Sequence, residues 1–181
     1  MTKVDFKERN GQIYAQLKEA LGIENANALP KMKAVSLNIG LGQNRLNKDM
    51  VGYIVAALGR ITGQKPVITR AKKAIAGYKL RTGDEVGVRV TLRRNKMYDF
   101  IDRLINVSLP RIRDFKGIDP KSFDKNGNLP IGLKDQVAFV ELGHDGLDRP
   151  FGVEITFKIT NSNPSASTEL LKGLGFPMKV S

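Results

Sequence analysis

Cysteine and tryptophan are absent from this chain of 181 residues, and histidine occurs once. The lack of cysteine excludes disulfide bonds, thiolate nucleophiles and cysteine-based zinc sites, and it is typical of proteins from a reducing compartment. No apolar run approaches the roughly 18 residues of a membrane span, so none is predicted. Residues 1–10 are rich in charge and contain no apolar stretch, so no secretory signal is expected there.

Acidic residues are the minority charge, with 18 Asp and Glu against 30 Lys and Arg, and the net charge is +12. The excess is concentrated between Gln64 and Lys96, where ten basic and two acidic residues leave a net charge of +8. A net charge of about 2–8 already keeps a small domain soluble, and this one segment supplies as much alone. The segment therefore predicts a polyanionic partner. Nucleic acid is favoured over a membrane surface because most of these cations fall in expected strands and loops.

The length and the regular apolar periodicity predict a single domain over residues 1–181. Four helices are predicted, over residues 5–21, 47–63, 95–110 and 163–175. Five strands are predicted, over residues 33–40, 66–71, 86–94, 137–142 and 152–160, and residues 111–134 are expected to be mostly irregular or to form a short hairpin. These elements predict the α+β class, with a mostly antiparallel twisted sheet, helices packed on one face and the other face open for RNA.

The open face of this sheet is predicted to be polar and cationic, because apolar residues alternate with polar ones along the strands. Its expected members are Ser36, Asn38, Thr69, Arg89, Thr91, Arg93, Thr156 and Lys158. Between two of the strands, Gly77 and Gly83 predict a basic protruding loop at about residues 73–84. Tyr78 is the only aromatic residue between positions 64 and 96, which favours contacts to the backbone and grooves of structured RNA over base stacking.

The sequence carries no recognisable catalytic or cofactor-binding motif. His144 has no metal ligand or nucleophile at a motif spacing and is interpreted as an ordinary loop residue. Gly40 and Gly42 open like a dinucleotide-binding fingerprint, but Arg45 occupies the place of the third glycine, so they are interpreted as a turn after a strand. Carboxylate pairs on expected helices are typical of surface ion pairing. We therefore expect no enzyme activity, no cofactor and no metal.

Several blocks of the sequence carry a family resemblance. Examples are TGQKPVITRAKK over residues 62–73, GVRVTLR over 87–93 and LPRIRDFKG over 109–117, with further blocks at 31–42, 75–81, 123–128 and 174–177. In this order they resemble the large-subunit ribosomal protein five family of the bacterial type, from about Pro30 to Pro177. The resemblance implies a structural constituent of the large ribosomal subunit that binds 5S rRNA and helps attach it in the central protuberance.

The resemblance also implies further partners: large-subunit rRNA, P-site tRNA, other central-protuberance proteins and, across an intersubunit bridge, the small-subunit head ribosomal protein thirteen. The implied location is the cytoplasm, bound to the ribosome, with an organellar ribosome kept open as an alternative. Residues implied to bind RNA are Asn38, Gln64, Lys65, Arg70, Lys72, Lys73, Arg89, Thr91 and Arg93. Those implied to reach tRNA from the loop are Tyr78, Lys79 and Arg81, and the region Arg111–Asp145 is implied to face the small subunit.

The sequence departs from the family pattern in its last third, at residues 139–142, 151–155 and 161–165. These changes keep the apolar alternation, so they bear on the intersubunit bridge more than on the fold or on RNA binding. Two other hypotheses stay open from the residues alone: a free-standing RNA chaperone and an RNA-modifying enzyme. The enzyme is less favoured because no catalytic acid, base or cofactor cradle is seen. Copurification with large subunits in a one-to-one ratio would separate a ribosomal constituent from a chaperone.

Overall fold

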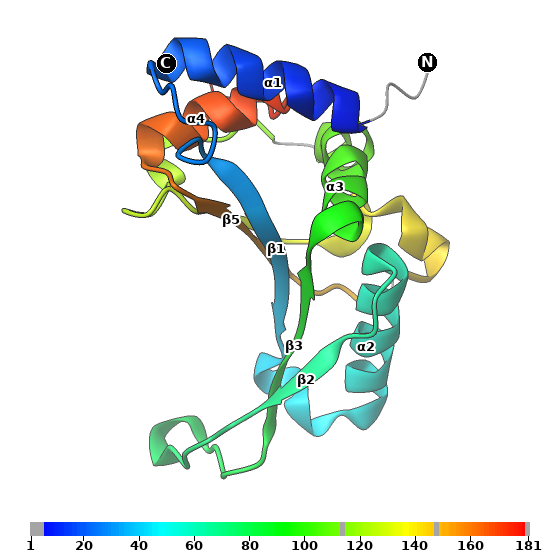
Figure 1. Cartoon of the computed structure of the whole chain (residues 1–181). Coiled ribbons are helices and arrows are strands. Elements are labelled where there is room, and N and C mark those ends of the chain that lie inside the picture. Colours follow the sequence, from blue (N-terminus) through cyan, green and yellow to red (C-terminus); the bar gives the residue numbers. More distant parts are fainter. Residues whose placement is uncertain (1–5, 113–114, 147–148, 180–181) are drawn as a thin grey trace. The chain divides into compact units, whose positions relative to one another are not determined.

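A five-stranded sheet is the framework of the computed structural model, which describes residues 6–112, 115–146 and 149–179 (Figure 1). The strands are β1 (Lys31–Gly40), β2 (Val67–Arg70), β3 (Glu85–Leu92), β4 (Leu129–Leu133) and β5 (Val153–Thr160), in the order β2-β3-β1-β5-β4. The α-helices are α1 (Phe6–Leu21), α2 (Lys48–Thr62), α3 (Arg94–Arg103) and α4 (Pro164–Gly173). Because β3 runs antiparallel to both β1 and β2 and helices pack against the sheet, the predicted α+β class is confirmed.

The chain divides into two compact units. One, called here the terminal unit, comprises Met1–Ala34, Arg93–Pro130 and Thr156–Ser181. The other, the middle unit, comprises Val35–Leu92 and Ile131–Ile155. Most of the predicted RNA-binding residues fall in the middle unit. Among the described residues, no helix has the length and apolar character needed to cross a lipid bilayer.

In the middle unit, α2 forms where the sequence predicts it because both of its ends are capped. The Asn47 side chain accepts hydrogen bonds from the backbone N–H groups of Asp49 and Met50, each at 3.1 Å. Gly63 ends the helix in the left-handed conformation, with φ of 63°. The apolar stripe of α2 includes Ile54, Leu58 and Ile61, all fully buried, and the helix packs against β3.

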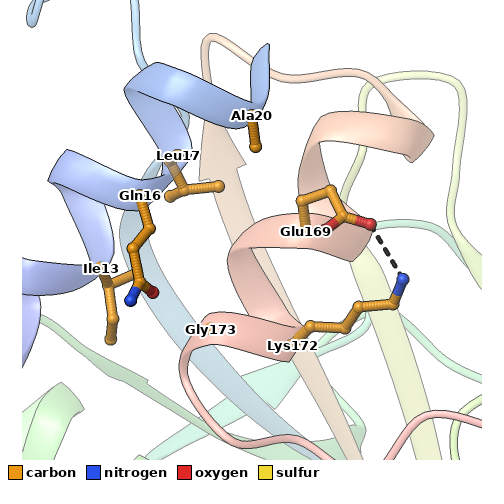
Figure 2. A pocket seen from close by; sticks show the side chains of 7 residues that line it. All are labelled: Ile13, Gln16, Leu17, Ala20, Glu169, Lys172 and Gly173. Carbon is orange, nitrogen blue, oxygen red and sulfur yellow. Dashed lines mark hydrogen bonds and ion pairs between the residues drawn. The ribbon is translucent and has the colours of Figure 1, made fainter.

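In the terminal unit, α1 packs against α4 (Figure 2). Ile13 and Leu17 of α1 are buried, and a Cβ atom on Gly173 would lie 3.0 Å from Ile13 Cγ2. The absence of a side chain at Gly173 therefore lets the two helices approach closely. The small groove between them also exposes the ion pair of Lys172 with Glu169 on α4, at 2.9 Å. Its lining is mainly aliphatic and its charges are paired, so it offers no chemistry of its own.

One of the predicted strands is wrong. Residues 137–142 do not form a strand, because the chain there folds into short 3-10 turns, Gln136–Ala138 and a stretch over Val140–Gly146 that is kinked at Gly143. The Gln136 side chain is fully buried and bonded to the main chain at positions 149 and 151, which curls the segment back on itself. The fifth strand is β4 instead, within the region expected to be mostly irregular or to form a short hairpin.

The boundaries of α3 also differ from the prediction. Arg93, and not Asn95, precedes the helix, and no side chain caps it. The chain turns into α3 through Arg94, whose φ is +54°. Pro110 does not close the helical path, because it lies in the first turn of a new 3-10 helix, Leu109–Arg111, where the missing N–H is tolerated. Residue 5 of the predicted first helix and the side chain of His144 lie outside the described part.

Candidate nucleic-acid interface

One face of the middle unit collects polar side chains from three adjacent strands. On β1, Ser36 is opposite Thr91 of β3, and Asn38 is opposite Arg89. On β2, Thr69 is opposite Gly87. Since directly opposite residues project to the same side of a sheet, these side chains share one face. We call Ser36, Asn38, Thr69, Arg89 and Thr91 the polar face. The alternate residues of β3, Val88, Val90 and Leu92, are buried on the other side.

Arg89 is exposed on the polar face, as the alternation of β3 predicts. Its Nε atom donates a hydrogen bond to Ser36 Oγ at 3.2 Å. Ser36 itself is only 6% exposed, so this hydrogen bond holds the Arg89 side chain close to the surface of the sheet. Sequence reasoning placed Ser36 on this face but gave it no role. Its partner is 53 residues away, and only the strand register brings the two together.

Gly87 makes room for the side chain of Thr69 and for the main chain of β1 on this face. A Cβ atom at this position would lie 2.9 Å from Thr69 Oγ1 and 3.0 Å from the carbonyl oxygen of Ile39. The same point is 3.8 Å from Asn38 Oδ1. The missing side chain therefore lets Thr69 and the main chain at Ile39 approach β3 closely, while Asn38 lies at ordinary contact distance. Gly40 lies opposite Gly87, so this part of the face consists largely of backbone.

Gln64 joins the end of α2 to the polar strand β3. Its Nε2 atom donates to the carbonyl oxygen of Thr91 at 3.3 Å. Two of the predicted hydrogen-bonding residues are thus adjacent, although 27 positions separate them in sequence. Lys65 follows Gln64 and is exposed. Arg93 is also exposed, and it belongs to the terminal unit, directly before α3.

The far end of the β2–β3 pair holds a cation that already has a partner. Arg70 Nη2 lies 3.3 Å from Glu85 Oε1, and the side chains are 66% and 33% exposed. The strand register shifts between Thr69 and Arg70, which brings the arginine opposite the glutamate. The sequence indicated Arg70 as a phosphate ligand but did not reveal Glu85 as its counterion. Any phosphate bound by Arg70 must therefore compete with this carboxylate.

The basic loop, residues 73–84, is a nested turn that extends beyond the ends of β2 and β3 (Figure 1). Its base is closed by Ala71, whose N–H donates to the Asp84 carbonyl at 2.8 Å and whose carbonyl accepts from Gly83 at 2.9 Å. Nearer the tip, Ile75 and Leu80 exchange two backbone hydrogen bonds around the 3-10 turn Ala76–Tyr78.

The cations of this loop and of its first turn point toward solvent. The exposed cations are Lys72, Lys73, Lys79 and Arg81. Tyr78, between them, is also exposed, at 72%. A sheet backed by helices on one side and polar and cationic on the other, next to an exposed basic loop, defines an α+β protein of the nucleic-acid-binding class.

Comparison with known proteins defines the family. The model of the family "Ribosomal protein L5" matches residues 25–81, and the model of the C-terminus of the same ribosomal family matches residues 85–178. The chain belongs to the ribosomal protein L5 family. It is therefore a structural constituent of the large ribosomal subunit, associated with the ribosome and binding rRNA, and it is not an enzyme. The two other hypotheses, an RNA-modifying enzyme and a free-standing chaperone, are set aside by this membership.

Similar proteins extend over nearly the whole chain. The large ribosomal subunit protein uL5 of Heliobacterium modesticaldum is 47% identical over 168 residues, which cover 93% of each chain. The uL5 protein of Carboxydothermus hydrogenoformans is 43% identical over 177 residues, 98% of each chain. The uL5 protein of a Psychrobacter species is 44% identical over 170 residues, 94% of this chain and 96% of its own.

Proposed function

We propose that the polar face and the basic loop are the surfaces through which this ribosomal protein holds RNA. The observation that carries the proposal is the register of β1, β2 and β3, which gathers amide, hydroxyl and guanidinium groups on one side of the sheet next to the basic loop. Such a face fits an A-form minor groove, where 2′-hydroxyls meet polar groups and cations hold the flanking phosphates. In this proposal the whole chain acts as one RNA-binding domain.

Each predicted residue has a role in the proposal. Asn38, Gln64 and Thr91 form hydrogen bonds to the RNA, and the phosphate ligands are Lys65, Arg70, Lys72, Arg89 and Arg93. Lys73 also contacts the RNA. The RNA on the polar face is 5S rRNA, which the protein helps to seat in the central protuberance beside large-subunit rRNA and neighbouring proteins. Tyr78, Lys79 and Arg81 of the basic loop contact P-site tRNA. The region Arg111–Asp145 faces ribosomal protein thirteen of the small-subunit head, and the ribosome is cytoplasmic.

Salt dependence of 5S rRNA binding tests this proposal. Binding that releases counterions weakens with salt, and a protein with about six phosphate contacts loses roughly a thousandfold in affinity between 50 and 200 mM. Arg89→Ala and Lys72→Ala are each expected to lower the slope of log K against log salt by about 1. Asn38→Ala is expected to weaken binding with little change in slope, since an amide releases no counterion. Affinities would be measured by filter binding across a salt series.

Lys18→Ala is the matched control, because Lys18 is exposed on α1 and no role in RNA binding is assigned to it. It is expected to leave both affinity and slope close to those of the unmodified protein. Slopes that stay unchanged in Arg89→Ala and Lys72→Ala would remove both residues from the contact surface. Normal affinity of Asn38→Ala would contradict its place in the interface.

The ion pair of Arg70 with Glu85 predicts a substitution that strengthens RNA binding instead of weakening it. Glu85→Gln removes the competing carboxylate and is expected to strengthen 5S rRNA binding by about two- to fivefold at low salt, in line with the roughly 0.2–1 kcal/mol of an exposed pair. In an Arg70→Ala background the same substitution should have a smaller effect, because no cation remains to be released. Equal gains in the two backgrounds would show that Glu85 acts only through net charge.

A further inference from the structure

The tip of the basic loop is tied to a residue outside the basic segment. Arg45 lies in the short 3-10 helix Gly42–Leu46, which follows β1 in the chain. Its Nη2 atom donates to the carbonyl oxygen of Lys79 at 2.9 Å and to that of Tyr78 at 3.3 Å. One guanidinium nitrogen thus bridges two consecutive carbonyls that lie 33 and 34 residues further along the chain.

The backbone conformation at Lys79 presents these carbonyls to Arg45. Lys79 adopts the left-handed conformation, with φ of 51° and ψ of 38°, and ends the turn Ala76–Tyr78. A residue other than glycine occupies this region at a cost of about 1–3 kcal/mol and needs support from its surroundings. The two hydrogen bonds from Arg45 supply such support, since they act on the carbonyls on either side of the strained Cα atom.

Packing contributes little at this tip. Ile75 is 47% exposed and Tyr78 is 72% exposed, while Leu80 is half-buried. A segment with few buried apolar contacts opens easily, so its polar contacts have a large share in ordering it. The Arg45 side chain is directed at this tip: its Nη2 atom makes both hydrogen bonds to the loop, while its Nε atom is buried and has no hydrogen-bond partner among the described residues.

We propose that Arg45 is a positioning residue that clamps the tip of the basic loop in the shape it presents to RNA. The claim that Arg45 affects RNA binding rests on the proposed function of the loop. The claim that Arg45 orders the tip of the loop does not depend on that function. Arg45 acts through geometry, by two hydrogen bonds to the main chain, and its charge is not the property that matters. Arg45→Lys keeps the charge but has a shorter reach and a compact ammonium group, so it separates the two properties.

Amide hydrogen exchange of the full chain without RNA tests the clamp. The amides of Ile75, Tyr78, Lys79 and Leu80 form the hydrogen bonds of the tip. In Arg45→Ala these four amides are expected to exchange about tenfold faster, as for the loss of roughly 1.4 kcal/mol of local stability. The amides of β1 and β3 should keep their rates. Unchanged exchange at the four tip amides would overturn the proposal.

Lys48→Ala is the matched control, because Lys48 is an exposed cation three positions away at the start of α2. It removes the same charge and should leave the exchange of the tip unchanged. Equal acceleration in Lys48→Ala and Arg45→Ala would show that net charge orders the loop, and would overturn the clamp.

Binding of a transfer RNA tests the functional half. Arg45→Ala and Arg45→Lys are both expected to weaken binding by about threefold to tenfold, while Arg45→Lys keeps the salt slope of the unmodified protein. Restoration of full affinity by Arg45→Lys would show a charge contact and overturn the positioning role. Lys79→Ala and Arg81→Ala could bind transfer RNA normally while the tip amides of Arg45→Ala exchange faster. That result would support the role of Arg45 in ordering the tip and contradict the RNA-binding role of the loop.

Discussion

Gly127→Ala is expected to lower the free energy of unfolding by about 3 kcal/mol or more, because it meets a backbone and a steric penalty together. Gly127 has φ of +75°, in the region that L-residues rarely adopt. A Cβ atom there would lie 2.5 Å from Ser167 Oγ and 3.0 Å from the carbonyl oxygen of Asn163. The serine cannot simply turn away, since its Oγ donates to the Gly127 carbonyl at 2.6 Å.

This turn also contacts the first turns of α4 and the C-terminal end of β5, so the substitution would disturb both elements. Asp124 accepts hydrogen bonds from the N–H groups of Asn126 and Asn128, and the bond from the Asn128 side chain holds the pKa of Asp124 below its usual value. Asn128 Oδ1 in turn accepts from the N–H of Ile159 at 3.1 Å.

Gly63→Ala is the matched control for Gly127→Ala. Gly63 has φ of +63°, but nothing lies within 4 Å of the position of its missing Cβ. It should therefore show only the backbone penalty, about 1 kcal/mol. Urea unfolding followed by circular dichroism would measure both variants. A loss in Gly127→Ala no larger than that in Gly63→Ala would contradict the close contact with α4.

Gln136→Ala is expected to cost about 3 kcal/mol, from a cavity and from backbone groups left without partners. Gln136 is fully buried, its Nε2 donates to the Arg149 carbonyl at 3.1 Å, and its Oε1 accepts from the Phe151 N–H at 2.8 Å. The residues that Gln136 holds also pack on α2. The guanidinium carbon of Arg149 lies 5.5 Å from the centre of the Tyr53 ring, and the ring of Phe151 meets the Tyr53 ring edge-on.

Two further variants separate the causes. Gln136→Leu keeps most of the side-chain volume and so leaves no large cavity. Any decrease in unfolding free energy in Gln136→Leu is therefore caused by the backbone groups that have lost their hydrogen-bond partners. Val137→Ala, at a side chain that is 56% exposed, should change stability by no more than about 0.5 kcal/mol. Thermal and urea unfolding would rank the three. A Gln136→Leu variant as stable as the unmodified protein would show that the buried hydrogen bonds contribute nothing net.

The sequence predicted those elements whose signals are local. The alternation of β1, β3 and β5 and the caps of α2 and α4 lie within a few residues of the elements they define, and these elements formed as expected. The prediction of a strand over residues 137–142 was wrong because the apolar residues there resemble a strand pattern. The actual fold of the segment depends on hydrogen bonds that Gln136 makes to residues 13 and 15 positions away. A hydrogen bond between residues so far apart in sequence cannot be predicted from the local pattern of apolar and polar residues.

The same limit applies to the candidate interface. Composition was enough to find the cations, because a net charge of +8 in one segment is visible without any structure. Their partners were not visible. Ser36 beneath Arg89, Glu85 beside Arg70 and the carbonyl of Lys79 above Arg45 are 53, 15 and 34 residues from the side chains they meet. Only strand register and loop closure bring these groups together.

The position of β3 between β2 and β1 affects how the sheet forms during synthesis. β3 lies between β2 and β1, although both of these precede it in the chain. A nascent polypeptide that has emerged only as far as Arg81 contains β1 and β2 but lacks the strand that joins them, so their edges stay unpaired. The polar face, which we propose to bind RNA, is therefore complete only after residue 92 has left the ribosome that is synthesising the chain.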